Sequence, residues 1–248
     1  MIIDGFGRPV KNLRISLTQN CNLSCPYCHR EGEDASNSGL RQMASEEIVR
    51  LIKIAISLGI GRIKLTGGEP LMRRDLLTIV EGIAAHTGLQ DLSLTTNGTL
   101  LAPVAEDLHS RGLQRVNVTL PTLRPSVYQK LINGDLKSVL QGIEAAVASG
   151  LHPVKINMVA LAGVNEQEIP EMIKYAQEAG ALLQLIELEP INLEKTCFKQ
   201  YHFSLEAIEA DFQARSMNIR VRKDMQNRRI YYLPEGRVEV IRPLENTE

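Results

Sequence analysis

The chain has 248 residues, of which 44% are hydrophobic, and a formal net charge of −1. This length suits one large domain or two small ones, with enough apolar residues for a substantial core. The near-zero charge provides no overall field that would favour nucleic acid or an anionic membrane, so neither is expected as a partner. The N-terminus lacks signal-peptide features and no apolar run reaches membrane-spanning length, which predicts a cytoplasmic protein.

Residues 12–18 alternate apolar and polar side chains, which predicts a β-strand. Helical and strand patterns then alternate along the chain, with Ser45 as the expected N-cap of the first helix. The predicted helices are 44–58, 73–86, 101–110, 136–149 and 166–179, and the further strands are 62–66, 91–95, 115–120, 153–160 and 182–188. This order is typical of a parallel sheet with helical crossovers, either doubly wound or a barrel. Polar and glycine residues at the C-terminal ends of several strands favour a barrel with its site at that mouth.

The pattern changes after Pro190. A helix at 202–213 and short strands at 217–223, 228–233 and 237–241 predict a small antiparallel β extension. We therefore expect a division of the chain into 1–190 and 191–248. Residues 215–242 contain eight basic and three acidic side chains, a net charge of +5. This segment is either a solvated sheet edge or a lid that faces phosphates.

Three cysteines, Cys21, Cys25 and Cys28, lie within eight residues in a CxxxCxxC spacing. Thiolates are preferred ligands of iron–sulfur clusters and of zinc. Zinc normally takes four ligands, whereas three thiolates on a cubane cluster leave one iron open to a small molecule. The alternatives are a structural zinc site completed by a residue such as His29, or three unrelated core thiols. Cys197 lies far along the chain and is read as a buried or incidental thiol.

Two further motifs follow predicted strands. The segment 66–70, Thr-Gly-Gly-Glu-Pro, presents backbone without side chains, so a bound molecule can approach it closely. Taken alone, this segment could be an ordinary strand-to-helix turn. Asn97-Gly98 is compatible with a hairpin turn, but the helical pattern that follows favours a loop at the barrel mouth. Thr119 ends another predicted strand, either with its hydroxyl towards that mouth or as an ordinary strand residue.

The cysteine spacing, with Tyr27 before the third cysteine, resembles the hallmark of the radical S-adenosylmethionine (SAM) enzymes. The resemblance implies a partial (β/α)6 TIM-type barrel and a four-iron, four-sulfur (4Fe-4S) cluster on the three cysteines, with SAM at the open iron. One electron, supplied to the cluster by a separate donor, would cleave SAM to a 5′-deoxyadenosyl radical. The residues that the resemblance assigns to SAM are Tyr27, Gly67, Gly68, Glu69, Thr119 and Glu189.

Longer stretches narrow the resemblance to the archaeal branch of the GTP 3′,8-cyclases, which begin molybdenum cofactor biosynthesis. They are LRISLTQNCNLSCPYCHREGE, IKLTGGEPLMRRDL, TTNG, RVNVTLPTL, VKINMVALAGVNEQEI and LIELEP. The family converts GTP to 3′,8-cyclo-7,8-dihydro-GTP after radical abstraction of the ribose 3′ hydrogen. The GTP contacts that it implies are Arg14, Lys64, Thr95 and Lys155, with the cations expected at the barrel mouth. Gln184, Pro121 and Glu189 stand where many relatives have Arg, Asp and Met.

Family members continue past a segment like 241–243 into a cysteine-containing tail, which binds a second cluster that receives guanine. This sequence ends at Glu248. We therefore expect weak GTP binding and SAM cleavage with little cyclised product. Two alternatives stay open: a radical SAM reaction on another phosphorylated or nucleotide substrate, and a non-catalytic iron–sulfur protein. Whether the chain forms a homodimer is also open.

Overall fold

Parallel strands alternating with helices form most of the chain in the computed structural model, which describes residues 2–28, 41–191, 193–222, 225 and 227–243. The chain divides into two compact units. The first comprises Met1–Asn22, Arg30–Asn117 and Ser138–Pro153, and the second comprises Leu23–His29, Val118–Lys137 and Val154–Glu248. The division expected at residue 190 remains a prediction. No helix among the described residues is long and apolar enough to cross a bilayer.

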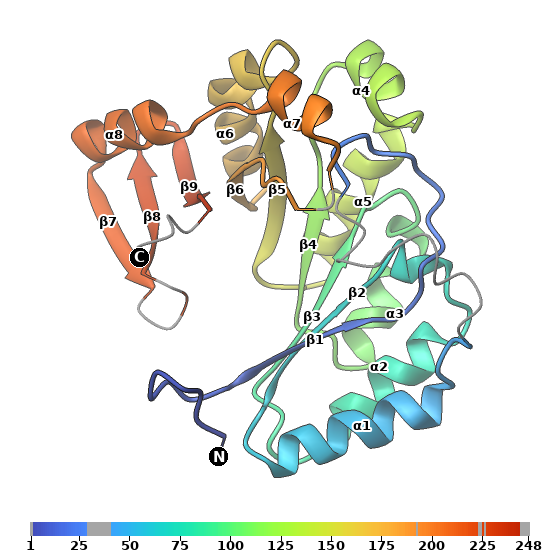
Figure 1. Ribbon diagram of the computed structural model, residues 1–248. Helices are drawn as coiled ribbons and strands as arrows, with labels where there is room; N and C mark the ends of the chain where they lie inside the picture. Colours follow the sequence, from blue (N-terminus) through green and yellow to red (C-terminus); the bar gives the residue numbers. More distant parts are fainter. Residues whose placement is uncertain (1, 29–40, 192, 223–224, 226, 244–248) are drawn as a thin grey trace. The chain divides into compact units, whose positions relative to one another are not determined.

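The first unit contains a parallel sheet in the order β1 (Asn12–Ser16), β2 (Arg62–Thr66), β3 (Asp91–Thr96), and it includes the start of β4 (Arg115–Thr119). The helices α1 (Ser45–Ser57), α2 (Leu76–Ala84), α3 (Ala105–Ser110) and most of α5 (Leu136–Ala148) belong to it, with short 3-10 turns η3 (Pro70–Met72) and η4 (Ala102–Val104). Figure 1 shows α1, α2 and α3 on one side of β1–β3.

The apolar residues of the strands explain this packing. Ile15 and Leu65 are register partners in β1 and β2, and both are buried. Ile48 and Ile52 of α1 and Ile79 of α2 are fully buried as well. Alternate residues of a strand point to opposite faces, so the opposite face carries polar side chains. The N-cap prediction was wrong: Ala44 is the N-cap, and the Glu47 carboxylate accepts a hydrogen bond from its backbone N–H at 2.7 Å.

The second unit contains a sheet in the order β5 (Val154–Ala160), β6 (Leu182–Glu187), β9 (Gly236–Ile241), β8 (Arg228–Leu233), β7 (Asn218–Arg222). Its helices are α4 (Pro125–Ile132), α6 (Ile169–Glu178), α7 (Lys195–Tyr201) and α8 (Glu206–Arg215), with the 3-10 turn η5 (Glu166–Glu168). β7, β8 and β9 are antiparallel, as expected, but β9 also pairs in parallel with β6. In Figure 1, α6 packs against β6 and β9, and α8 packs against β8.

Candidate functional site

Cys21 lies in the loop that follows β1. Backbone hydrogen bonds connect this loop to the turn after β2. The backbone N–H of Gly68 donates to the Thr18 carbonyl at 2.6 Å, and the N–H of Glu69 donates to the Asn20 carbonyl at 2.7 Å. Three further hydrogen bonds hold this segment at Leu17. The Leu17 N–H donates to the Thr66 carbonyl, and the Leu17 carbonyl accepts from the side chains of Gln42 and Arg73. The glycine motif therefore holds the backbone that carries the first cysteine.

The close approach of these two segments explains both glycines. A Cβ atom at Gly67, where φ is +143°, would lie 2.4 Å from the Thr18 carbonyl oxygen. A Cβ atom at Gly68 would lie 2.3 Å from the Asn20 carbonyl oxygen. Backbone atoms cannot yield as a flexible side chain can, so any larger residue displaces the loop. The motif is thus needed for the loop's own conformation, in addition to the cofactor contact that the sequence predicts.

We expect Gly68→Ala to lower cluster content and SAM binding together, because the added methyl group pushes against the cysteine loop. Overpacking of this kind costs about 1–3 kcal/mol of the unfolding free energy. Thermal unfolding, iron analysis and SAM titration would measure the effect. Gly5→Ala is the matched control, since a Cβ atom there meets nothing within 4 Å. Unchanged melting temperature and iron content in Gly68→Ala would contradict the steric argument.

The Glu69 side chain is fully buried, and its carboxylate forms hydrogen bonds within the protein. Its carboxylate accepts hydrogen bonds from Thr96 Oγ1 at 2.7 Å, the Asn97 N–H at 2.6 Å and the Leu71 N–H at 3.0 Å. Burial raises the pKa of this carboxyl group, and the hydrogen bonds from Thr96, Asn97 and Leu71 oppose that rise. A contact from this residue to a cofactor would therefore come from its main chain.

Cys25 and Cys28 belong to the second unit, with Tyr27 between them in a tight turn. The Cys28 N–H donates to the Cys25 carbonyl at 3.2 Å. Tyr27 is buried, and this burial is the main reason that its pKa is raised well above the usual value. Electrostatic repulsion from Cys25 and Tyr128 raises this pKa further. Cys197 is half-buried, and its Sγ lies 3.6 Å from the Pro26 carbonyl oxygen, so this thiol contacts the cysteine loop. No pattern in the sequence predicts that contact.

The donor set fits an iron–sulfur cluster by its chemistry. Cys21 and Cys28 are exposed and Cys25 is half-buried, so soft thiolate ligands are accessible on the loop. His29, the alternative zinc ligand, lies outside the described residues. Among the described residues, no three His, Cys, Asp or Glu side chains are grouped to hold a metal ion. The cluster assignment therefore rests on the thiol spacing and on the comparisons below.

The remaining residues predicted to bind SAM lie at strand ends of the second unit. Thr119 is the last residue of β4, and Glu189 follows β6 by two residues. Both side chains are half-buried. Gly67 is half-buried and Gly68 is exposed. Each of these residues lies at or just beyond the C-terminal end of a strand of its own unit, and the contacts to SAM remain predictions.

Three of the predicted GTP contacts share the polar face of the first unit. Arg14 and Lys64 are register partners, and Lys64 pairs with Ser93, two residues before Thr95. The hydroxyl oxygen of Thr95 is buried without a hydrogen-bond partner among the described residues. A buried hydroxyl group normally has such a partner, so a polar ligand would satisfy it. Arg14 and Lys64 stand in the middle of their strands, further back than the mouth at which they were expected.

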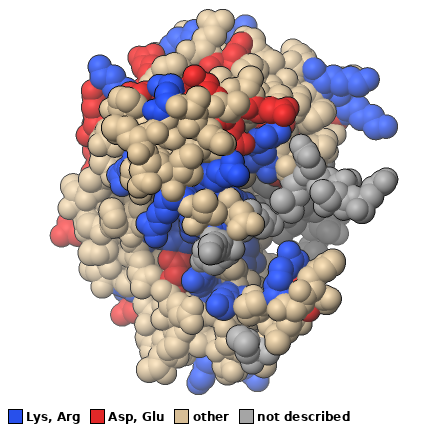
Figure 2. Space-filling model, turned by 90° about the vertical axis from the view of Figure 1, so that its left-hand side faces the viewer, with Lys and Arg blue, Asp and Glu red and all other residues tan. Residues whose placement is uncertain are grey.

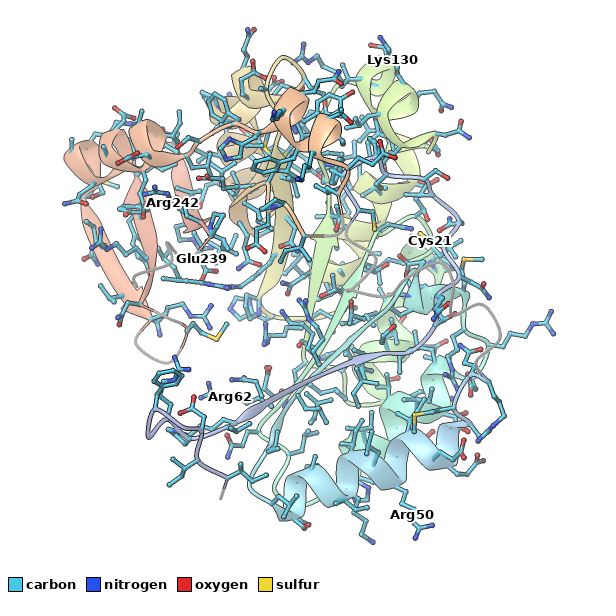
Figure 3. The ribbon with its side chains drawn as sticks, in the orientation of Figure 1. Cys21, Arg50, Arg62, Lys130, Glu239 and Arg242 are labelled. Carbon is cyan, nitrogen blue, oxygen red and sulfur yellow. The ribbon has the colours of Figure 1, made fainter. Side chains whose placement is uncertain are left out.

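Lys155, the fourth predicted contact, lies in a buried network of the second unit. Its Nζ is 2.6 Å from Glu239 Oε2, which also accepts from Gln184 Nε2 at 2.6 Å. Arg222 donates to the other oxygen, Oε1, at 2.9 Å. Glu239 is fully buried, and Figure 3 shows it on β9. Sequence reasoning missed Glu239 and Arg222, although Glu239 stood out as an acid between the valines of an otherwise basic segment.

Comparison with known proteins defines the class to which this fold and three-thiol loop belong. Residues 15–176 match the Radical SAM superfamily. The structure of SuiB of Streptococcus suis bound to S-adenosylmethionine is similar over 82% of this chain and 46% of its own, with a TM-score of 0.66 and 18% identity. The structure of anSMEcpe with bound AdoMet is similar over 73% and 52%, with a TM-score of 0.58 and 21% identity. The protein is a radical SAM enzyme, whose cofactors are a 4Fe-4S cluster and SAM.

Proteins similar in sequence identify a family within this superfamily. A probable GTP 3′,8-cyclase of Methanothermobacter thermautotrophicus is 44% identical over 246 residues, which are 98% of this chain and 79% of that protein. One of Pyrococcus abyssi is 47% identical over 254 residues, covering 100% and 81%. The chain belongs to the GTP 3′,8-cyclase family. The predicted fold class, family and cofactors are thereby confirmed.

Proposed function

We propose that this chain binds GTP and converts it to 3′,8-cyclo-7,8-dihydro-GTP, the step that begins molybdenum cofactor biosynthesis. The observation that carries the proposal is the sequence identity of 44% and 47%, over nearly all of this chain, to probable GTP 3′,8-cyclases of two archaea. When bound, the cluster and SAM supply the radical that starts the reaction. Everything else in the reaction depends on how the protein's own side chains hold the nucleotide.

The polar face of the first unit has the chemistry that a nucleoside triphosphate requires. Arg14 and Lys64 are adjacent cations on neighbouring strands, suited to charge-assisted hydrogen bonds with phosphate. The buried Thr95 hydroxyl adds a polar group two residues along the same face of β3 from Ser93, the register partner of Lys64. Figure 2 shows one face of the molecule, on which several Lys and Arg side chains are exposed. In this proposal the cations hold the phosphates and Thr95 orients the nucleotide, which keeps the reacting ribose and base in a fixed position.

The proposal also covers the surroundings of the reaction. In this proposal the electron that enters the cluster comes from a separate donor. Accessible thiols such as Cys21 and Cys28 persist in a reducing compartment, which supports a cytoplasmic location. Formation of a homodimer remains a prediction.

We expect Arg14→Ala and Lys64→Ala each to weaken GTP binding by roughly 10- to 100-fold, because each removes a charged hydrogen-bond partner worth about 1.5–3 kcal/mol. Titration of the anaerobically reconstituted full chain with GTP, guanosine and other nucleoside triphosphates would measure this, with product analysis by mass spectrometry. Arg50→Ala is the control, since Arg50 is exposed on α1 and points away from the strands (Figure 3). Equal affinity for guanosine and GTP would contradict the phosphate role of these cations.

A further inference from the structure

Three sequence motifs meet in the first unit at Asn97. The Asn97 backbone N–H donates to the buried Glu69 carboxylate of the glycine motif at 2.6 Å. Its side-chain Nδ2 donates to Asn22 Oδ1 at 2.9 Å and lies 3.9 Å from Cys21 Sγ. Figure 3 shows Cys21 on the loop that follows β1. One residue of the TTNG segment therefore connects a cysteine of the cluster motif to Glu69.

The orientation of the Asn97 amide is determined by its other partner. The Thr99 backbone N–H donates to Asn97 Oδ1 at 3.0 Å, and the Thr99 hydroxyl donates to the same oxygen at 2.7 Å. A backbone N–H can only donate, so the amide oxygen has to face Thr99. The amide nitrogen consequently faces Cys21 and Asn22, and the alternative flipped amide is excluded.

Glu69 fixes the backbone from which this amide projects. The carboxylate is fully buried and also accepts from Thr96, the residue before Asn97. The Thr96 hydroxyl in turn accepts from the Gly98 N–H at 3.0 Å. The turn at 96–99 is thus held by hydrogen bonds on both sides of Asn97, which leaves its side chain little freedom to move away from the cysteine.

We propose that Asn97 is a positioning residue for the cluster: it donates a hydrogen bond to the Cys21 thiolate and so raises the cluster's reduction potential. The inference rests on the radical SAM class and not on GTP as the substrate. Reduction adds negative charge to a cluster and its sulfur ligands, and a donor at one sulfur stabilises that charge. Radical SAM chemistry begins with reduction of the cluster, so this donor makes the first electron easier to supply.

The test is a redox titration of the cluster, followed by electron paramagnetic resonance, in the full chain reconstituted anaerobically without SAM or nucleotide. Asn97→Leu removes the donor without adding charge and should lower the midpoint potential while retaining four irons per chain. Asn12→Leu is the matched control, because Asn12 is an exposed asparagine on β1 of the same unit. Its potential should equal that of the unmodified chain.

A second variant keeps the test decisive if Asn97→Leu fails to load the cluster. Thr99→Val leaves Asn97 in place but removes the hydroxyl that holds its amide oxygen, so it should lower the potential by a smaller amount. A purely structural role for Asn97 would lower the melting temperature and leave the potential of both variants unchanged. That result, or a higher potential in either variant, would overturn the proposal. GTP binding plays no part in these measurements, so failure of the proposed substrate would not alter them.

Discussion

Replacing Cys21, Cys25 or Cys28 by alanine should abolish binding of the four-iron cluster, whereas Cys197→Ala should retain it. A cubane cluster on three thiolates loses a covalent ligand in each of the first three variants. Iron and sulfide analysis, together with the visible absorption of the anaerobically reconstituted protein, would measure the loss. SAM cleavage should disappear in the same three variants.

Cys197 makes this experiment more demanding than the sequence alone suggested. Its sulfur contacts the Pro26 carbonyl within the cysteine loop, so its removal alters the surroundings of the cluster without removing a predicted ligand. A small change in cluster stability or spectrum is compatible with that contact. Loss of the cluster in Cys197→Ala, or the finding of zinc alone in the reconstituted protein, would show that the ligand assignment is wrong.

The parallel core was predictable because its strands carry short-range patterns that do not depend on distant residues. The helix α4 was not predicted, although it begins at Pro125 and proline is favoured in the first turn of a helix. The helix expected at 202–213 begins later, as α8, and a break separates it from α7, which was not expected. The break occurs where the Glu187 carboxylate accepts from the Leu205 N–H at 3.0 Å and lies 3.0 Å from the His202 ring. That tertiary contact is invisible in a local pattern.

The same distinction applies to the site. The cysteine spacing is local, so the cluster ligands could be predicted from eight residues. The partners of Glu69 and Glu239 could not, because they depend on which strands lie side by side. Lys155 contacts Glu239, 84 residues along the chain, only because β9 pairs with β6 and β6 pairs with β5. A lysine that looked like a simple phosphate ligand is thus also part of the protein's own buried charge network.

The Glu239 network predicts a large effect on stability. Glu239→Gln should lower the unfolding free energy near neutral pH by about 3–5 kcal/mol, because it breaks the buried ion pair between Glu239 and Lys155. Denaturant unfolding of the full chain without cofactors would measure it. Glu178→Gln is the matched control: Lys174 Nζ lies 3.8 Å from Glu178 Oε1, and both side chains are mostly exposed. A surface pair of this kind contributes at most about 1 kcal/mol.

The pH dependence separates loss of charge from loss of packing. Burial raises the pKa of Glu239, but Lys155 and Arg222 outweigh it and hold the pKa below the usual 4.5. The ionised carboxylate therefore contributes stability above its unfolded-state pKa, and this contribution is lost as the pH falls through the folded-state pKa. The gap in stability between the unmodified chain and Glu239→Gln should be widest above about pH 5 and narrow on acidification. If the difference in stability between the two proteins stays constant as the pH is lowered, Glu239 stabilises the unit through shape and hydrogen bonding alone, without its charge.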